Sequence, residues 1–215
     1  MKAPVKPPRP VPPPGREQAR TRLARRAVVD AARTLFVAGG YTTTSIEAIS
    51  QLADVPQATV YRLFGSKRGI LKALLDQSIA GDDQARAVNE RPDIAALFAE
   101  PDAAKLLAGF AGVTTAINQR SHDVYRLLLS AADSDPAAAE LLDELNQQRL
   151  QGQSEIARAL QDHGSLRAGL TPRHAADLVH TLMSPEVFRL LVIDRRWSPD
   201  RYRQWLAATL VQQLT

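Results

Sequence analysis

The stretch TSIEAISQLADVPQATVYRLFGSK, residues 44–67, has the pattern of two short helices joined by a tight turn. The hydroxyl of Thr44 or of Ser45 can cap the first helix, and Glu47 stands three residues after Thr44, which is the spacing of a capping box. Asp54 falls where the chain must reverse, and Asp is one of the few residues besides Gly that adopt the left-handed backbone conformation. The stretch therefore predicts a helix-turn-helix.

The second helix of this pair has an outer face that suits DNA. Pro56 fits its first turn, where a backbone N–H is not needed. Val60 and Leu63 are spaced to point inward. A short helix with a polar outer face can enter the major groove of DNA and read base edges there. The residues left for that face are Gln57, Ala58, Thr59, Tyr61 and Arg62.

The composition limits the kinds of protein that this chain can be. It has 215 residues, of which 45% are hydrophobic, enough for one or two domains with a sizeable core. It has no Cys, so it forms no disulfide and no thiolate metal site, which suits the reducing cytoplasm. The longest uncharged apolar-rich run, residues 106–119, is too short and too polar to span a bilayer, and the N-terminus lacks the apolar core of a secretory signal. We expect a cytoplasmic protein with no membrane partner.

The charge is uneven along the chain. Residues 1–15 carry three Lys/Arg, residues 16–80 carry ten Lys/Arg and five Asp/Glu, and residues 81–215 carry fourteen Lys/Arg and eighteen Asp/Glu. The three segments thus have charges of +3, +5 and −4. The basic part coincides with the helix-turn-helix pattern, which favours binding to a polyanion there. A solvated basic helix is the alternative explanation of the same charges.

The segment from about residue 20 to residue 79 resembles the DNA-binding domain of the tetracycline-repressor (TetR) family of bacterial transcription regulators. Three positions depart from the family pattern: Ser50 and Asp54, where Ala and Gly are usual, and Pro56, where Ser or Ala is common. The final segment SPEVFRLLVIDRRWSPDRYRQWLAATL also resembles the C-terminal domain of one subgroup of the family. The positions that match the DNA-binding pattern are Gly40-Tyr41, Thr44-Ser45, Ile49, Val55, Tyr61, Phe64 and Ser66-Lys67.

The chain divides into three segments. Residues 1–15 hold seven of the fourteen prolines and predict an extended tail, either an inert leader or a basic arm that reaches DNA. Residues 16–80 predict the DNA-binding domain, in which an amphipathic helix over 16–38 precedes the helix-turn-helix and a linking helix capped by Ser66 follows it. Residues 81–215 predict a larger helical domain for effector binding and dimerisation.

This larger domain shows helical patterns and no convincing alternating strand, so the predicted fold class is all-α. Proline and cap residues mark several of the helix starts. Pro185 either kinks one of the helices or starts a new one. The expected helices are Ile94–Ala99, Asp102–Asn118, Asp123–Ala132, Pro136–Gln161, Pro172–Asp194 and Pro199–Leu214.

These features favour a ligand-responsive transcription regulator, which is usually a repressor in this family, bound as a homodimer to a palindromic double-stranded DNA operator. Gln57 can pair with adenine and Arg62 with guanine, while Ala58 can meet a thymine methyl group. Thr59 is a further candidate for contact with base edges.

The resemblance also implies contacts to the DNA backbone. Thr44, Tyr61 and Lys67 would contact phosphates, and Ser45 belongs to the same surface. Thr44 and Lys67 stand at helix N-termini, where backbone N–H groups attract anions. Each residue also has a purely structural explanation: Thr44 as a cap, Tyr61 as a packing residue and Lys67 as a solvated charge.

The larger domain, by the same resemblance, holds a mostly apolar pocket for a small-molecule effector and a dimer interface in which late helices form a four-helix bundle. The candidate pocket residues, each of which is also explained as simple core, are Phe98, Phe110, Thr114, Asn118, Tyr125, Leu129 and Met183. The candidate interface residues, on the helices ending near Gln161 and Asp194, are Phe188, Leu191 and Val192.

No motif for nucleotide binding or hydrolysis is found, and the four histidines (His122, His163, His174 and His180) lack metal-ligand spacing. We therefore expect no enzyme activity, no cofactor and no metal. Two other functions stay open: an architectural DNA-binding protein without effector, and a helical small-molecule-binding protein or enzyme that reuses the fold. A cluster of titratable residues in the pocket would favour the latter, and the sequence shows none.

Overall fold

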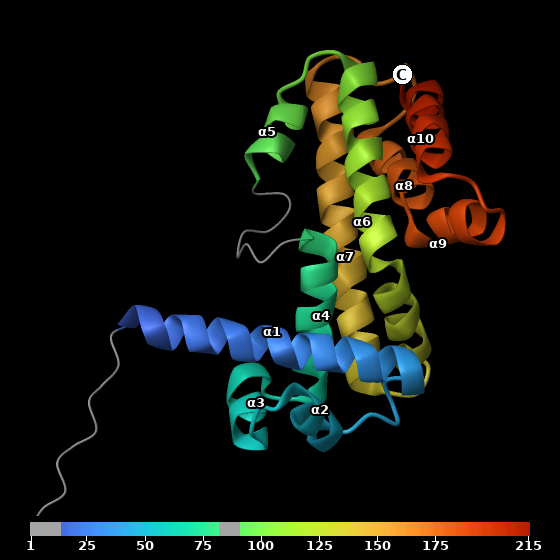
Figure 1. Cartoon of the computed structure of the whole chain (residues 1–215). Helices are drawn as coiled ribbons and strands as arrows, with labels where there is room; N and C mark the ends of the chain where they lie inside the picture. The colour runs from blue at the N-terminus through green and yellow to red at the C-terminus, as the bar shows by residue number, and fades with distance from the viewer. Residues whose placement is uncertain (1–13, 82–90) are drawn as a thin grey trace, which may run out of the picture.

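The computed structural model of the chain describes residues 14–81 and 91–215, and the regular structure of these ranges is entirely helical. Figure 1 shows the order of the helices along the chain. Of the tail predicted for residues 1–15, residues 1–13 lie outside the described residues, whereas Pro14 and Gly15 begin the first helix. None of the described helices is long and apolar enough to cross a membrane.

The N-terminal part consists of four helices whose bounds agree closely with the sequence pattern. They are α1 (Pro14–Gly39), α2 (Ile46–Ala53), α3 (Gln57–Phe64) and α4 (Lys67–Ala80). In Figure 1, α2 and α3 lie below α1, and α4 rises from them beside α6. The α2–α3 pair forms the predicted helix-turn-helix, and α4 is the predicted linking helix.

Local side chains fix the turns of this motif. Ser45 caps α2, since its hydroxyl accepts a hydrogen bond from the Ala48 N–H at 3.1 Å. Asp54 ends α2 in the left-handed conformation, with φ 52° and ψ 41°, as its position predicts. Because Ser45 rather than Thr44 is the cap, Glu47 stands only two residues after it, and the predicted capping box is absent.

The hydrophobic core of the helix-turn-helix extends beyond the first four helices. Val28, Ile49 and Val60 are fully buried at its centre, where α1, α2 and α3 meet. Leu128 of α6 and Leu141 of α7 belong to the same cluster. The foot of the C-terminal helices therefore packs directly on the DNA-binding unit, which allows a movement of α6 or α7 to reach it.

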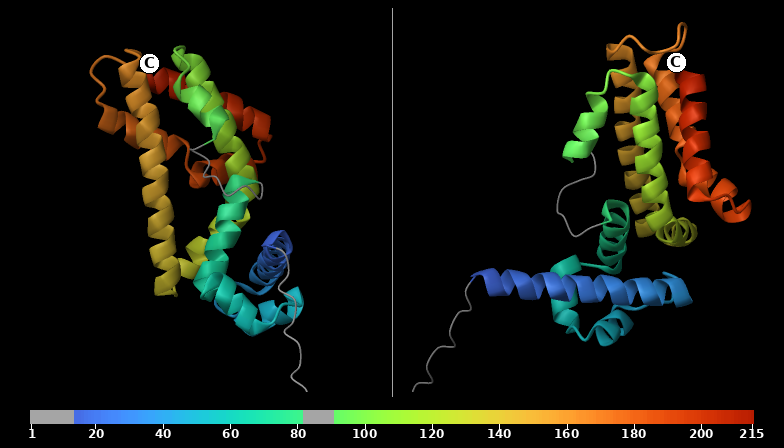
Figure 2. Two further views of the ribbon diagram at one scale, coloured as in Figure 1. Left: turned by 90° about the vertical axis from the view of Figure 1, so that its left-hand side faces the viewer. Right: turned by 45° about the horizontal axis from the view of Figure 1, so that its top comes forward.

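The C-terminal part is a helical bundle; the right view of Figure 2 shows α1 across its foot, and in both views the C-terminus lies at the far end. Asp102, Asp135, Thr171, Ser184 and Ser198 each cap a helix by accepting backbone N–H groups. The elements are α5 (Pro92–Phe98), α6 (Ala103–Ala132), α7 (Pro136–Asp162), α8 (Pro172–Leu182), α9 (Pro185–Phe188), the π-helical turn η2 (Arg189–Asp194) and α10 (Pro199–Leu214).

Two expectations for this part need correction. The separate helices predicted over Asp102–Asn118 and Asp123–Ala132 are one continuous helix, α6. The polar residues between the two predicted helices include no Pro or Gly, and the Ser121 hydroxyl donates a hydrogen bond to the Ile117 carbonyl one turn earlier, so the helix continues through them. The helix predicted over Pro172–Asp194 is divided, since Pro185 starts a new helix that Ser184 caps.

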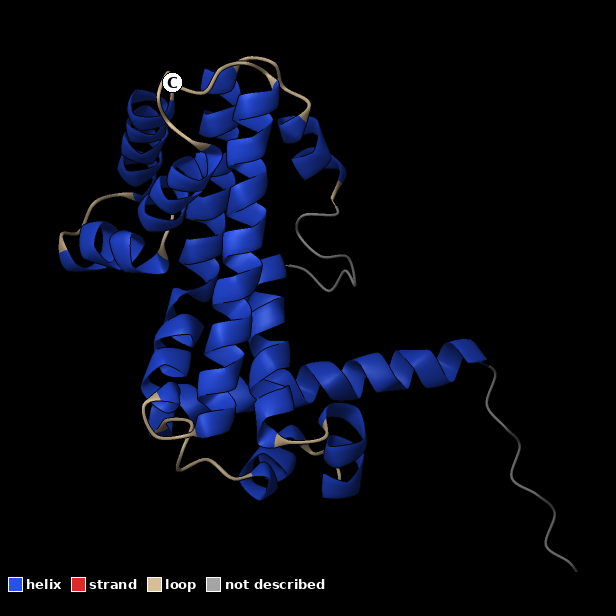
Figure 3. Cartoon of the chain, turned by 180° about the vertical axis from the view of Figure 1, so that it is seen from behind, coloured by secondary structure: helices blue, strands red, loops and turns tan. Residues whose placement is uncertain are grey.

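Figure 3 shows from behind how loops alone join these helices. The second hydrophobic cluster lies where α10 packs on α6 and α8 packs on α7. Phe188 and Tyr202 are fully buried in it, with ring centroids 5.2 Å apart and nearly perpendicular. The two clusters divide the molecule into a lower and an upper core that share α6 and α7.

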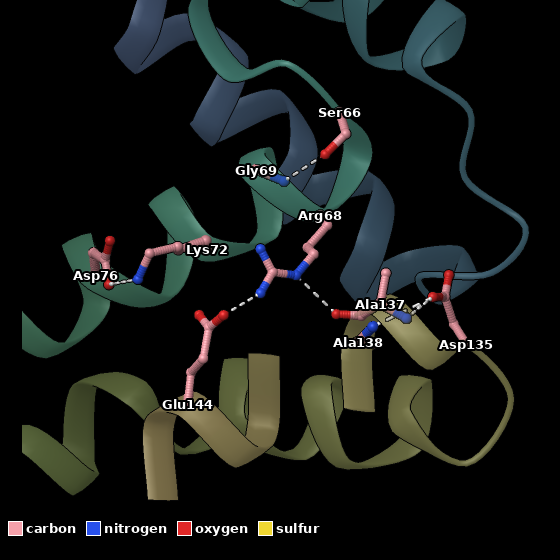
Figure 4. Close-up of polar contacts among 9 residues, drawn as sticks. All are labelled: Ser66, Arg68, Gly69, Lys72, Asp76, Asp135, Ala137, Ala138 and Glu144. Atoms are coloured by element: carbon pink, nitrogen blue, oxygen red, sulfur yellow. Dashed lines mark hydrogen bonds and ion pairs between the residues drawn. The ribbon is translucent and has the colours of Figure 1, made fainter. Parts of the chain in front are cut away.

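Arg68 joins the first turn of α4 to α7. Its Nε donates to the Ala137 carbonyl at 3.0 Å, and its Nη2 donates to Glu144 at 2.5 Å. Figure 4 shows the guanidinium between these two groups of α7. Because Lys67 and Arg68 begin α4 directly after the helix-turn-helix, this contact ties the position of α3 to the position of α7.

Candidate functional site

The outer face of α3 is open to solvent. Its inner side is Val60, which is fully buried. Within the described residues, no hydrogen bond or ion pair occupies the side chains of Gln57 or Arg62, so both are available to a ligand. The face brings together the half-buried Thr59 with four exposed residues: Gln57, Ala58, Tyr61 and Arg62.

The N-terminal end of α2 forms a shallow hollow beside this face. Thr44, one of the predicted phosphate contacts, is 7% exposed, and its hydroxyl donates to the Gly40 carbonyl at 2.8 Å. Thr44 thus braces the loop before α2, while Ser45 keeps an exposed position at the helix end. The residues around the hollow are Thr42, Thr43, Thr44, Ser45, Ile46, Glu47, Gln57, Tyr61 and Lys67.

Lys67 folds back onto the loop that precedes α2. Its ammonium donates to the carbonyls of Tyr41, Thr42 and Thr44 at 3.0, 3.3 and 3.2 Å, respectively. It also lies 4.3 Å from the centroid of the Tyr41 ring, within cation–π range. The three N–H groups of the ammonium therefore have partners inside the protein, and the positive charge is fixed in place at the edge of the hollow.

Arg25 of α1 contacts the C-terminal end of α3. Its guanidinium donates to the Leu63 carbonyl at 2.9 Å and lies 4.7 Å from the centroid of the Phe64 ring. The sequence analysis did not single out this residue, because a basic residue on a basic helix has no distinguishing local pattern. Arg25 thus fixes the C-terminal end of α3 to α1, and Lys67 fixes the start of α4 to the loop before α2.

A cavity of about 1,250 Å³ extends from α1 and α4 into the upper core. Phe98 and Phe110 stack against each other at its apolar wall, with ring centroids 4.9 Å apart. Leu129, predicted in the pocket, instead packs against the lower core, because it faces away from α5 on the far half of α6. The other six predicted pocket residues line the cavity: Phe98, Phe110, Thr114, Asn118, Tyr125 and Met183.

The cavity also has polar and titratable residues that the sequence analysis did not expect. Arg149 and Gln153, one turn apart on α7, line it together with Asn118 and Tyr125 of α6. The Tyr125 hydroxyl donates to Glu186 at 2.6 Å. The expectation that the pocket has no titratable cluster was wrong. The sequence could have shown it, because Arg149 has the helical spacing of Leu145 and Ile156 and therefore lies on the same inward-facing side of α7.

Burial shifts the pKa values of this cluster. Burial, together with the hydrogen bond to Glu186, strongly raises the pKa of Tyr125, so the phenol stays protonated at neutral pH. Burial lowers the pKa of Arg149 and also that of His180, which lies 2.6 Å from Gln153 through its Nδ1. The nearby Arg149 charge lowers the pKa of His180 further.

The predicted dimer contact at Phe188 needs correction. Phe188 is 1% exposed within a single protomer, because its ring fills the upper core beside Tyr202, and it therefore cannot reach a partner. Leu191 and Val192 are half-buried. The apolar residues that η2 does present to solvent are Leu190, which is 48% exposed, and Ile193, which is 39% exposed.

The sequence of the N-terminal helices matches a known protein family. Residues 28–74, which run from the core of α1 through the helix-turn-helix into α4, match the profile of bacterial regulatory proteins of the tetR family. This match assigns residues 28–74 to the tetR family of bacterial regulatory proteins. A 56-residue stretch is also 39% identical to the uncharacterized HTH-type transcriptional regulator YvkB of Bacillus subtilis (strain 168), over 26% of this chain and 30% of that relative's length.

The fold of the described residues, 14–81 and 91–215, is similar to solved structures. NalD, the secondary repressor of the MexAB-OprM multidrug efflux pump in Pseudomonas aeruginosa, aligns over 91% of this chain and 98% of its own, with a TM-score of 0.70 and 22% identity. FadR from Bacillus subtilis in complex with stearoyl-CoA aligns over 88% and 99%, with a TM-score of 0.68 and 18% identity. SmeT in its triclosan complex aligns over 89% and 91%, with a TM-score of 0.66 and 17% identity. At these identities the likeness is one of fold.

Proposed function

We propose that this tetR-family protein is a ligand-responsive transcription regulator, a repressor that binds a palindromic operator as a homodimer and is released by a small molecule. The observation that carries the proposal is the exposed outer face of α3, whose C-terminal end is fixed to α1 by Arg25, while Lys67 after it is fixed to the loop before α2. A rigid helix with free Gln57 and Arg62 side chains is suited to base reading in a major groove.

The contacts to DNA divide between the two helices of the motif. On α3, Gln57, Thr59 and Arg62 would read base edges, and Ala58 would meet a thymine methyl group. The hollow before α2 would receive the backbone, with Ser45 and Tyr61 among the direct contacts. Thr44 and Lys67 would support these contacts from behind, Lys67 through its fixed positive charge.

The cavity would be the effector site, and the Arg68 contact would transmit its state. Arg149 in the cavity and Glu144 at the Arg68 contact lie on the same helix, α7. A ligand that displaces α7 would therefore move α4 and, with it, α3. Such rigid-body movement changes the separation of two recognition helices in a dimer, and thereby the fit to paired half-sites.

The dimer interface would include the exposed side of η2. Leu190 and Ile193 replace Phe188 as the central candidates, with Leu191 and Val192 at their side. Exposed apolar residues that lie close together are typical of a surface that a partner covers. Figure 1 shows α9 and the turn after it on the outer side of the bundle, away from the helix-turn-helix.

The titratable cluster in the cavity favours binding over catalysis. Glu186 already accepts the Tyr125 hydrogen bond, and the raised pKa of Tyr125 leaves the phenol without a base role at neutral pH. No enzyme activity or cofactor enters the proposal, which places the protein in the cytoplasm with the DNA. The enzyme alternative predicts turnover of a cavity ligand, and the architectural alternative predicts DNA binding that no small molecule changes.

The proposal is tested by selecting DNA from a random pool with the full-length protein and repeating the binding measurement with small-molecule mixtures. We expect a two-fold symmetric sequence and loss of binding with at least one mixture. Recovery of no preferred sequence would favour the architectural alternative. A preferred sequence whose binding responds to no compound would retain the DNA-reading part and overturn the effector part.

A further inference from the structure

The cavity has apolar and polar lining residues. Phe98, Phe110 and Ile156 form apolar surface, whereas Asn118 of α6 and Arg149 of α7 are polar lining residues that both lie close to Tyr202. A ligand that fills such a space needs an apolar body and a polar group at one end. The question is the charge of that polar group.

Arg149 has a guanidinium nitrogen without a partner. Its Nη1 makes one long hydrogen bond of 3.4 Å to Asn146, while its Nη2 is buried and makes none. No carboxylate of the described residues lies within ion-pair distance of it, and Glu186 is engaged by Tyr125. A buried guanidinium with an open donor is unfavourable unless an acceptor, best an anion, completes it.

Asn118 supplies a second open donor in the cavity lining. Its side chain is 4% exposed, and its Nδ2 has no hydrogen-bond partner. The Tyr202 hydroxyl lies beside Asn118 and near Arg149 but outside the cavity lining, and neither it nor the Asn118 Nδ2 has a partner of normal geometry. Buried polar atoms are rarely left unsatisfied, so the open donors of Asn118 on α6 and Arg149 on α7, which both line the cavity, indicate an absent ligand.

The available groups favour an anion over a cation. Of the acidic side chains that line the cavity, Asp76 pairs with Lys72, and Glu155 lies six residues after Arg149 on α7. Beside Arg149, the oxygens of Gln153 and Glu186 have partners, since Gln153 contacts His180 and Glu186 accepts from Tyr125. A ligand ammonium placed there would meet the Arg149 charge, whereas a carboxylate would meet the N–H groups of Arg149 and Asn118.

From this arrangement we infer that the cavity binds an organic anion, a molecule with an apolar aliphatic or aromatic body whose carboxylate pairs with Arg149 and Asn118. The inference rests on the proposed function, because it names the chemical class of that effector. The pairing would compensate the buried Arg149 charge and draw α7 toward α6. Since Glu144 lies on α7, the same movement would reach the Arg68 contact.

The test uses full-length protein and three matched probe series. The probes are octanoate and 4-phenylbutyrate, their primary amides, and the amines octylamine and 4-phenylbutylamine, with dissociation constants measured by calorimetry. We expect the acids to bind about tenfold to a hundredfold more tightly than the amides, as the loss of a hydrogen bond to a charged group predicts, and the amines to bind most weakly. Amides or amines that bind as tightly as the acids, or acids that do not bind, would overturn the inference.

Variants of α7 locate the pairing. Arg149→Met replaces the guanidinium by an unbranched apolar side chain and should weaken acid binding until the acids bind no more tightly than the amides. Arg149→Lys keeps a positive charge and should retain part of the preference for acids over amides. Arg158→Met, on the exposed side of the same helix, is the matched control and should leave the preference unchanged. An acid preference that survives in Arg149→Met would overturn the assignment to Arg149.

Operator binding in the same samples separates this inference from the proposed function. Acids that bind with the expected preference but leave the operator complex intact would retain the organic-anion site and overturn its effector role. Release of the operator by the amides or amines alone would retain the regulator and overturn the organic-anion inference.

Discussion

The ammonium of Lys67 lies 4.3 Å from the centroid of the Tyr41 ring and donates a 3.0 Å hydrogen bond to the Tyr41 carbonyl. Tyr41 is itself nearly buried, with its ring centroid 5.3 Å from that of Phe36 at the end of α1. The start of α4 is thereby fixed to the loop between α1 and α2. The position of the helix-turn-helix depends on this contact as well as on its hydrophobic core.

We predict that Lys67→Ala destabilises the protein by about 1–3 kcal/mol, because three backbone carbonyls lose a donor and the cation–π contact is lost. DNA binding should weaken alike for operator and random DNA. Urea unfolding and the salt dependence of binding measure the two effects, with Lys72→Ala, whose partner Asp76 is exposed, as the control. Unchanged stability with a shallower salt dependence would instead make Lys67 a phosphate contact only.

The Arg68–Glu144 contact should couple the two parts of the protein. Arg68→Ala and Glu144→Ala should each reduce the effect of a cavity ligand on operator affinity, and the double variant should reduce it no further than Arg68→Ala alone. The ion pair is partly exposed, so each change should alter stability only modestly. Additive effects of the two substitutions on ligand-induced release would contradict a shared pathway. Asp200→Ala, which removes an exposed pair on α10, is the control.

The corrected position of Phe188 changes what its substitution should do. Phe188→Ala should destabilise the protein by about 3–5 kcal/mol, because it leaves a cavity in the upper core. Leu190→Asp and Ile193→Asp should instead leave the fold intact and yield monomers, since both side chains are exposed in the protomer. Sedimentation velocity and urea unfolding distinguish these results. A Leu190→Asp/Ile193→Asp double variant that remains dimeric would move the interface to another surface.

The half-buried His180 predicts a pH dependence of stability. Its pKa in the folded state lies below the unfolded value of 6.5, so the unfolded chain binds the proton more readily. The contribution of neutral His180 is therefore fully present above about pH 6.5 and is lost as the pH falls below that value. His180→Gln should show a smaller loss of stability than the wild type between pH 7 and pH 5 in thermal unfolding. Identical losses would mean that His180 does not titrate in this range.

Local signals made most of the fold predictable. The helix over Pro199–Leu214 was confirmed at both ends because Ser198-Pro199 is a strong start signal, and Asp54 took its left-handed turn as expected. The predicted break before Asp123 was wrong because polar residues without Pro or Gly do not stop a long helix that packs on both sides. Local pattern likewise could not show that Phe188 fills the protomer's own core.

A candidate site could be predicted from the sequence only where its residues all lie within one short segment. The face of α3 is such a segment, since five of its eight residues point outward together. The roles of Lys67 and Arg25 depend on contacts with residues 23 to 38 positions away in sequence, which no spacing rule shows. The cavity residues Asn118 and Arg149 come from two helices, and Glu186, which accepts from Tyr125, comes from a third, so this arrangement could be seen only in the fold.

The most direct test of the account measures base preference and stoichiometry together. Sedimentation of the wild-type protein on a selected operator should show an even number of protomers, with binding about a thousandfold or more tighter than to random DNA. Arg62→Ala and Gln57→Ala should each lose about 1–3 kcal/mol on the operator and relax the preference at one base position per half-site. A single bound protomer, or an Arg62→Ala protein that weakens equally on operator and random DNA, would contradict reading of paired half-sites by α3.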